Sequence, residues 1–302
     1  METVKILNFE NNGVRIAADG EFLYLGSKGT LSKYRLSDMS LAAHTAIRDN
    51  TKKKTIYNML WFSIFGEYIF VWDFCDLHVA LKEDLQLLYT IRLGENSSSD
   101  ICGALDFDKT NAYINIRNGR IDVFNTNTKQ ATRFEISNST IWAHCIIGNR
   151  IYCGTAKGEL LEIERLTMRV IRKIQLTKNM AIYSVVFYNN MLYTTSERSI
   201  KVIDANTFEV MPIDSQNEEL RMNGIYAEEL QTTEANIIGI CGKNIVVAEH
   251  RNIALFNTET LLLRERFNFP TGYRFLRYAV LDGEKLYGSD EHGIYCRYLG
   301  DK

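Results

Sequence analysis

IYCGTAKGELLEIE (151–164) is the stretch that decides the fold, because its pattern returns along the whole chain. It consists of two short segments rich in apolar and β-branched residues, joined by a turn that contains Gly158. Such segments are typical of antiparallel strands, and glycine is typical of the tight turn between two strands. Six other segments follow the same pattern: LYLGSKGTLSKYRL (23–36), IFVWDFCDLHVAL (69–81), AYINIRNGRIDVFN (112–125), LYTTSERSIKVID (192–204), IVVAEHRNIALFN (245–257) and LYGSDEHGIYCRYL (286–299).

The seven segments recur at a nearly constant spacing. Their first residues are 46, 43, 39, 41, 53 and 41 positions apart. An apolar strand precedes each segment and an outer strand such as RVIRKIQL (169–176) follows it, so each repeat supplies four strands. A period near 40–45 residues with four strands is typical of a propeller blade. The pattern therefore predicts an all-β fold: one domain over residues 1–302, a seven-bladed β-propeller of four-stranded antiparallel blades, with an insertion at 214–235 between the fifth and sixth blades.

The two ends of the chain complement each other. The seventh repeat stops at IYCRYL (294–299), after three strands. TVKILNF (3–9) stands before the first repeat and alternates as the outer strands do. If this segment pairs with the last blade, no sheet edge is left exposed there. We therefore expect the N-terminal strand to close the propeller.

Blade number, strand order and the closing strand resemble the WD-repeat class of seven-bladed propellers over essentially all 302 residues. The resemblance lies in the architecture, since the signature dipeptides of that class are missing. The third strands end in pairs such as Phe124-Asn125 and not in Trp-Asp, the Gly-His pair is absent, and the one Trp-Asp pair, Trp72-Asp73, falls on a second strand. The resemblance implies a protein that takes part in protein–protein interactions.

Composition limits the classes of function only broadly. The 35 Lys and Arg residues nearly balance the 37 Asp and Glu residues, giving a formal charge of −2 that points to no particular partner. The longest apolar stretches, such as LWFSIF (60–65), are far shorter than the roughly 20 residues that span a bilayer, and METVKILNF lacks the apolar core of a secretory signal. The six cysteines form no metal-binding pattern. We therefore expect a cytoplasmic or nuclear location, reduced cysteines, no metal and no cofactor.

Sequence motifs of catalysis are absent. The chain contains no nucleophile elbow, zinc-binding helix motif, phosphate-binding loop or dinucleotide-binding glycine motif. The predicted inner strands, which would line the central channel of a propeller, carry few ionisable groups: Arg15, Asp106, His144, Arg274 and Arg277. An enzyme acting at the central channel is therefore the least favoured interpretation, and no catalytic residue is predicted.

The favoured interpretation is a non-enzymatic scaffold or complex subunit that binds proteins through the loops of one face. That face carries the turns between second and third strands and the connections between blades, and it is the more basic one in the predicted arrangement. An alternative is that the same basic loops bind a phosphate-bearing ligand, either nucleic acid or a phosphoprotein, since RDNTKKKT (48–55) lies among them. The predicted partner-binding residues are Lys28, Lys52, Lys53, Lys54, Phe74, Lys157, Arg198, Tyr226, Arg251 and His292.

Overall fold

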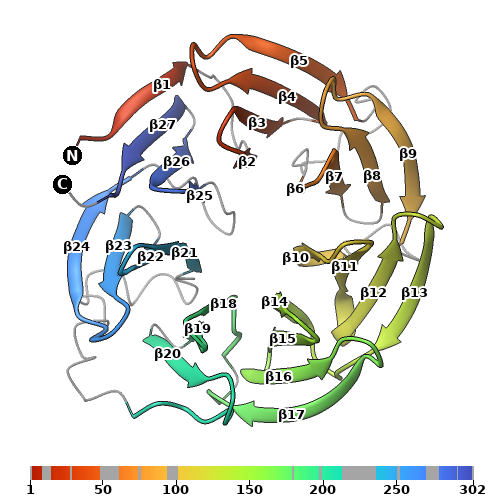
Figure 1. Ribbon diagram of the computed structural model, residues 1–302, viewed down its shortest axis with the longest axis vertical. Helices are drawn as coiled ribbons and strands as arrows, with labels where there is room; N and C mark the ends of the chain where they lie inside the picture. Colours follow the sequence, from red (N-terminus) through yellow and green to blue (C-terminus); the bar gives the residue numbers. More distant parts are fainter. Residues whose placement is uncertain are drawn as a thin grey trace. The chain divides into compact units, whose positions relative to one another are not determined.

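The computed structural model describes residues 2–8, 15–27, 29–47, 61–73, 76–93, 101–178, 180–196, 199–212, 236–249, 252–269, 279–290 and 292–300. These residues form seven antiparallel sheets and one short 3-10 turn, which confirms the predicted all-β, seven-bladed propeller fold. Each sheet is one blade, and Figure 1 labels its strands. Two compact units divide the chain: residues 1–97, 250–253 and 267–302 form the first, and residues 98–249 and 254–266 form the second.

The first unit contains blades 1, 2 and 7. Blade 1 consists of β2 (Arg15–Ala18), β3 (Phe22–Ser27), β4 (Thr30–Arg35) and β5 (Leu41–Ala46). Blade 2 consists of β6 (Trp61–Phe65), β7 (Tyr68–Asp73), β8 (Asp76–Leu81) and β9 (Leu87–Arg92). Blade 7 consists of β25 (Ala279–Asp282), β26 (Lys285–Ser289), β27 (Gly293–Tyr298) and β1 (Val4–Asn8).

The N-terminal strand β1 is the outer strand of blade 7. It pairs antiparallel with β27, with Val4 opposite Cys296 and Asn8 opposite Gly293, and Figure 1 shows the two strands side by side. Ile6 and Leu7 pack against a buried cluster that includes Ile294. The predicted closure of the propeller by the N-terminal segment is therefore confirmed.

The second unit contains blades 3 to 5 and most of blade 6. Blade 3 consists of β10 (Ile101–Phe107), β11 (Asn111–Ile116), β12 (Arg120–Asn125) and β13 (Gln130–Glu135), with the 3-10 turn η1 (Arg117–Gly119) between β11 and β12. Blade 4 consists of β14 (Ile141–Ile147), β15 (Arg150–Thr155), β16 (Glu159–Glu164) and β17 (Arg169–Gln175). Blade 5 consists of β18 (Ser184–Tyr188), β19 (Met191–Ser196) and β20 (Ser199–Asp204). Blade 6 consists of β21 (Asn236–Cys241), β22 (Asn244–Ala248), β23 (Asn252–Asn257) and β24 (Leu263–Asn268).

Blade 5 departs from the predicted four strands within the described residues. Its outer position is occupied by a single bridge between Ile203 and Val210 and by a hydrogen bond from the Met211 N–H to the Val202 carbonyl oxygen (2.8 Å). Pro212 follows directly, and proline has no N–H to donate to a ladder. The expected insertion at 214–235 begins just beyond and lies outside the described residues.

The core lies between neighbouring blades of each unit. Tyr113 of blade 3 packs with Ile151 and Leu161 of blade 4, and Tyr152 of blade 4 packs with Leu192 of blade 5. Because successive strand residues point to opposite faces, each blade buries apolar side chains on both sides. In this arrangement the loops between strands are the parts of each blade that are left for binding.

The register of β14 and β15 keeps Cys145 and Cys153 apart. Cys145 lies opposite Tyr152, and Cys153 lies opposite His144, so the two cysteines are not cross-strand partners. Both thiols are free, and burial raises the pKa of each. These cysteines are inert core residues.

Candidate functional site

Eight of the ten predicted partner-binding residues lie outside the described residues. They are Lys28, Lys52, Lys53, Lys54, Phe74, Arg198, Tyr226 and Arg251. Lys157 and His292 are described, and each is exposed on the turn after the second strand of its blade, as predicted. Lys157 lies in the second unit and His292 in the first. The predicted set is therefore untested as a site, and so is the phosphate-binding alternative that depends on it.

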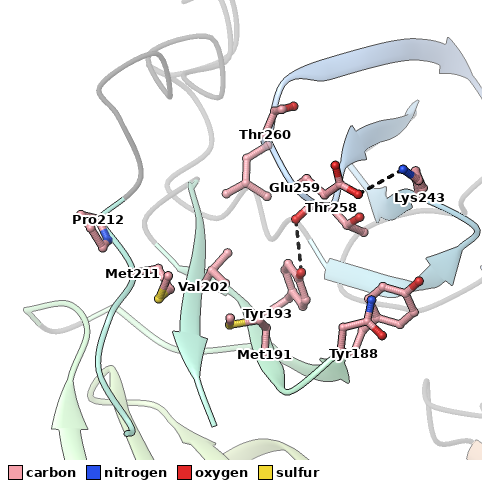
Figure 2. A pocket seen from close by; sticks show the side chains of 12 residues that line it. Tyr188, Met191, Tyr193, Val202, Met211, Pro212, Lys243, Thr258, Glu259 and Thr260 are labelled. Atoms are coloured by element: carbon pink, nitrogen blue, oxygen red, sulfur yellow. Dashed lines mark hydrogen bonds and ion pairs between the residues drawn. The ribbon is translucent and has the colours of Figure 1, made fainter. Parts of the chain in front are cut away.

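A surface pocket of about 560 Å³ lies between blades 5 and 6, inside the second unit. We call it the blade 5–6 pocket, and Figure 2 shows its lining. Blade 5 contributes two tyrosines, two methionines, a valine and a proline, while blade 6 contributes its first and third turns. The lining residues are Tyr188, Asn189, Met191, Tyr193, Val202, Met211, Pro212, Lys243, Thr258, Glu259, Thr260 and Leu261.

Local backbone conformation places these residues. Asn189 and Asn190 both have positive φ angles (48° and 62°), which the tight turn between β18 and β19 requires and asparagine tolerates. On the blade 6 side, Asn257 Oδ1 accepts hydrogen bonds from the N–H groups of Glu259 and Thr260, both at 2.9 Å. The two turns are thereby fixed before any partner arrives.

The tyrosine hydroxyls of the pocket are already engaged. The Tyr193 hydroxyl donates to the carbonyl oxygen of Thr258 (3.2 Å), and the Tyr188 hydroxyl donates to that of Gly242 (3.4 Å). Burial raises the pKa of Tyr193, and the charge of Glu259 adds to the shift. The Tyr193 hydroxyl therefore stays protonated at neutral pH, and the two hydrogen bonds link blade 5 to blade 6.

One ion pair lies at the rim of the pocket. Lys243 Nζ is 3.2 Å from a carboxylate oxygen of Glu259, and the two side chains are 69% and 67% exposed. Exposed pairs of this kind contribute about 0–1 kcal/mol and rearrange readily. Glu259 can therefore exchange Lys243 for another cation.

The lining of the blade 5–6 pocket contains no cysteine, histidine, aspartate or serine. Its hydroxyl groups belong to two tyrosines and two threonines, and the Thr260 hydroxyl donates to Asn257 Oδ1 (3.2 Å). In the part of the chain that the structure covers, no group of three or more His, Cys, Asp or Glu side chains could hold a metal ion. Over the same residues, no helix is long and apolar enough to cross a membrane.

The inner-strand carboxylate Asp106 has a structural partner on the next blade. Its Oδ2 accepts the N–H of Ile146 from blade 4 (3.0 Å). Burial raises the pKa of this carboxyl, against the effect of hydrogen bonds from Phe107 and Ile146. Asp106 therefore joins β10 to β14, while Arg274 and Arg277 of the predicted channel set lie outside the described residues.

Sequence reasoning missed the blade 5–6 pocket. One of its lining residues, Val202, lies opposite Tyr193 across β19 and β20. The equivalent residues of blades 1 and 4 are Lys33 and Glu162, each opposite a tyrosine. Blades 2, 3 and 7 carry the uncharged residues Val79, Val123 and Cys296 at the same place, so Val202 alone gave no signal. The available signal was Met211-Pro212 where an outer strand was expected.

Comparison with solved structures identifies the fold. A chain of the mitotic checkpoint complex aligns at a TM-score of 0.73 with 12% identity, covering 98% of this chain and 91% of that one. The WD40 domain of Pan2 from Neurospora crassa aligns at 0.69 with 11% identity, covering 99% and 96%. The fold is that of a WD-repeat-like seven-bladed propeller. BamB from Moraxella catarrhalis also aligns, at 0.63 with 13% identity, covering 96% and 85%.

No protein-family model and no curated protein sequence matches the chain. At 11–13% identity the structural matches establish the WD-repeat-like fold alone. The lack of Trp-Asp pairs at the ends of the third strands, and of any Gly-His pair, agrees with degenerate repeats, in which the blades are kept and the signature residues are not. The function has to be argued from the surface of this chain.

Proposed function

We propose that this chain is a non-enzymatic protein-interaction scaffold, a subunit that holds partner proteins in a complex through loops on one side of its propeller blades. The blade 5–6 pocket carries the proposal: its walls combine apolar and polar groups, its tyrosine hydroxyls are satisfied within the chain, and its turns are held by their own hydrogen bonds. A preformed pocket of this kind favours binding, because a partner side chain loses water there while the protein needs little reordering. WD-repeat-like propellers commonly act in protein complexes, which supports the same conclusion.

The proposed binding side differs from the one favoured by the sequence. The blade 5–6 pocket is bordered by first and third turns, whereas the predicted residues Lys157 and His292 lie on second turns. We also propose that the chain acts in the cytoplasm or nucleus, which the free thiols of Cys145, Cys153 and Cys296 support. Imaging of a fluorescent fusion in the native cell tests this location.

Reconstitution tests the scaffold function. Proteins captured with the tagged chain from its native cell are purified and recombined with the recombinant chain. We expect at least one of them to co-elute at fixed stoichiometry in size-exclusion chromatography, without turnover of any small molecule. If no captured protein recombines, or if the purified chain instead consumes a metabolite, the proposal is wrong.

A further inference from the structure

We propose that the blade 5–6 pocket receives a basic side chain, lysine or arginine, from an extended segment of the partner protein. This inference rests on the proposed scaffold function and names the chemistry of its binding site. The argument comes from two other blade junctions of the same chain, where a basic side chain of the chain itself occupies the corresponding place.

The first template is the junction of blades 1 and 2. Lys33, which is only 5% exposed, extends its ammonium to the backbone carbonyl oxygens of Lys82 (2.9 Å) and Glu83 (3.0 Å) in the third turn of blade 2. The same ammonium lies 3.8 Å from the centre of the Phe22 ring. Two carbonyl oxygens and an aromatic face thus bind one cation between two blades.

The second template is the junction of blades 4 and 5. Arg172 Nη1 donates to the carbonyl oxygen of Asn206 (2.8 Å), and Nη2 donates to that of Ala205 (3.3 Å). Its guanidinium lies 4.9 Å from the centre of the Phe208 ring and pairs with the buried carboxylate of Glu162. A different cation on a different strand therefore binds the same pair of turn carbonyls.

Backbone hydrogen bonds establish that these third turns are equivalent. The N–H groups of Lys82, Ala205 and Thr258 each donate to a carbonyl oxygen in the first turn of the same blade. Thr258 and Glu259 of blade 6 therefore correspond to Lys82 and Glu83 of blade 2 and to Ala205 and Asn206 of blade 5.

Among the described residues, no basic side chain of blade 5 takes this place at the junction of blades 5 and 6. Val202 stands opposite Tyr193 as Lys33 stands opposite Tyr24, and Met191 takes the place of Phe22. Tyr193 donates to the Thr258 carbonyl oxygen, and within the described residues no donor reaches the backbone carbonyl oxygen of Glu259. The space that a long basic side chain fills elsewhere is here the pocket of about 560 Å³.

The lining suits a cation supplied from outside. The Glu259 carboxylate and the carbonyl oxygens of the third turn present negative charge, while Tyr188, Tyr193 and Met191 can enclose the aliphatic stem. Lys243 is the one cationic side chain of the lining, and its pair with Glu259 is exposed at the rim. An incoming guanidinium or ammonium replaces it at the carboxylate.

A peptide series with one varied residue tests the inference. The probes are acetylated Ala-Ala-Leu-Xaa-Leu-Ala-Ala amides in which Xaa is arginine, lysine, citrulline or norleucine. Binding is followed by the methyl NMR signals of Met191 and Met211. We expect the arginine and lysine peptides to shift both signals saturably, and the citrulline and norleucine peptides to bind at least tenfold more weakly.

Val202→Lys is the decisive variant, because it copies the blade 1 template into blade 5. Its ammonium should reach the carbonyl oxygens of Thr258 and Glu259 and reduce the affinity for the arginine peptide at least tenfold. Val202→Met adds similar bulk without charge, so it should preserve the preference for arginine over citrulline. Glu259→Gln should weaken arginine binding about threefold to tenfold, and it serves as the test if Val202→Lys does not fold.

Specific outcomes overturn the inference. They are equal affinity for the arginine and citrulline peptides, the lack of any methyl shift at millimolar peptide, or unchanged binding by folded Val202→Lys. The reconstituted complex separates this inference from the scaffold function. If Val202→Lys still assembles with the partner at wild-type affinity, the basic side chain does not enter this pocket although the scaffold function stands; if the wild-type chain assembles with nothing, the scaffold function itself fails.

Discussion

Arg172 of blade 4 donates a hydrogen bond from Nη1 to the backbone carbonyl oxygen of Asn206 in blade 5, over 2.8 Å. The guanidinium is held for this contact by the buried carboxylate of Glu162, which also pairs with Arg150 at 3.0 Å. Glu162 is 2% exposed, so its charge is tolerable only because two arginines neutralise it. Blade junctions in this chain therefore depend on cations that cap turn carbonyls as well as on apolar packing.

Replacement of Arg172 by alanine should lower the free energy of unfolding by about 1–3 kcal/mol, because hydrogen bonds to Ala205 and Asn206 and one partner of Glu162 are lost together. Arg150 remains beside Glu162 and limits the loss. Urea denaturation measures the change.

The double variant Glu162→Val with Arg172→Met copies the residues of blade 5 into blade 4 and is the matched control. Since it removes the buried charge together with its partner, it should be more stable than Arg172→Ala alone. The error of such measurements is about 0.3 kcal/mol. If the free energy of unfolding of Arg172→Ala lies within that error of the wild-type value, this account is wrong.

Arg165 and Asp108 form another contact between a cation and a turn, at the junction of blades 3 and 4. The contribution of this contact should make the stability of the protein depend on pH. Burial alone would raise the pKa of Asp108, but hydrogen bonds from Thr110, Tyr113 and Asn111 outweigh it and lower the pKa below its ordinary value. Arg165 of blade 4 lies 2.9 Å from the same carboxylate. An acid with a lowered pKa in the folded state stabilises the protein above its unfolded pKa, and this contribution is lost as the pH falls through the folded value.

Asp108→Asn should therefore be less stable than wild type at pH 7 and should approach wild-type stability near pH 3. Thermal unfolding from pH 7 to pH 3 measures the difference. Asp204→Asn is a suitable control, because Asp204 caps an exposed turn of blade 5 through Asn206 and Thr207 without a bound arginine in the described structure. If the difference in stability between Asp108→Asn and wild type stays constant from pH 7 to pH 3, ionisation of the Asp108 carboxylate does not contribute to stability.

The sequence predicts the features of the fold that depend on repeat spacing and on the alternation of apolar residues. It does not predict the blade 5–6 pocket or the exact start of a strand, because these depend on the packing and backbone conformation of single residues. The seven repeats and the closing strand both follow from spacing. The start of β24 at Leu263 does not follow from spacing, because Leu261 has a φ of 55° and lies in the turn before the strand. A leucine can be buried in a turn or in a strand, so the local pattern of apolar residues does not distinguish the two.

Leu261 belongs to a set of third-turn residues with positive φ. In each case the N–H of this residue donates to the carbonyl oxygen four residues earlier. The set is Met39, Leu85, Lys129, Met168, Phe208 and Leu261. Four of them, Leu85, Met168, Phe208 and Leu261, are at most 6% exposed, and each belongs to the cluster between its own blade and the one before. Burial thus compensates for a left-handed conformation that disfavours L-residues by roughly 1–2 kcal/mol.

Two substitutions in this set should change stability in opposite directions. Leu85 is fully buried in the cluster of blades 1 and 2, so Leu85→Ala should cost about 2–5 kcal/mol. Lys129 is exposed with a φ of 58°, so Lys129→Gly should raise the free energy of unfolding by about 0.5–1 kcal/mol as the strain is relieved. Chemical denaturation measures both. A destabilising Lys129→Gly would show that its side chain contributes more than the backbone strain costs.

The closing strand provides the last prediction. Deletion of residues 1–8 removes β1 and leaves the edge of β27 unpaired, together with the contacts of Ile6 and Leu7. A fully buried aliphatic side chain contributes about 1.5–3 kcal/mol, so two half-buried ones and their ladder should contribute about 2–4 kcal/mol. The truncated chain should unfold at lower urea, and a synthetic peptide of residues 1–13 added in trans should restore part of the loss. Val4→Ala is the control, because Val4 is 57% exposed and its truncation should change stability by less than about 0.5 kcal/mol. If the truncated chain keeps wild-type stability and ignores the peptide, β1 does not hold the last blade closed.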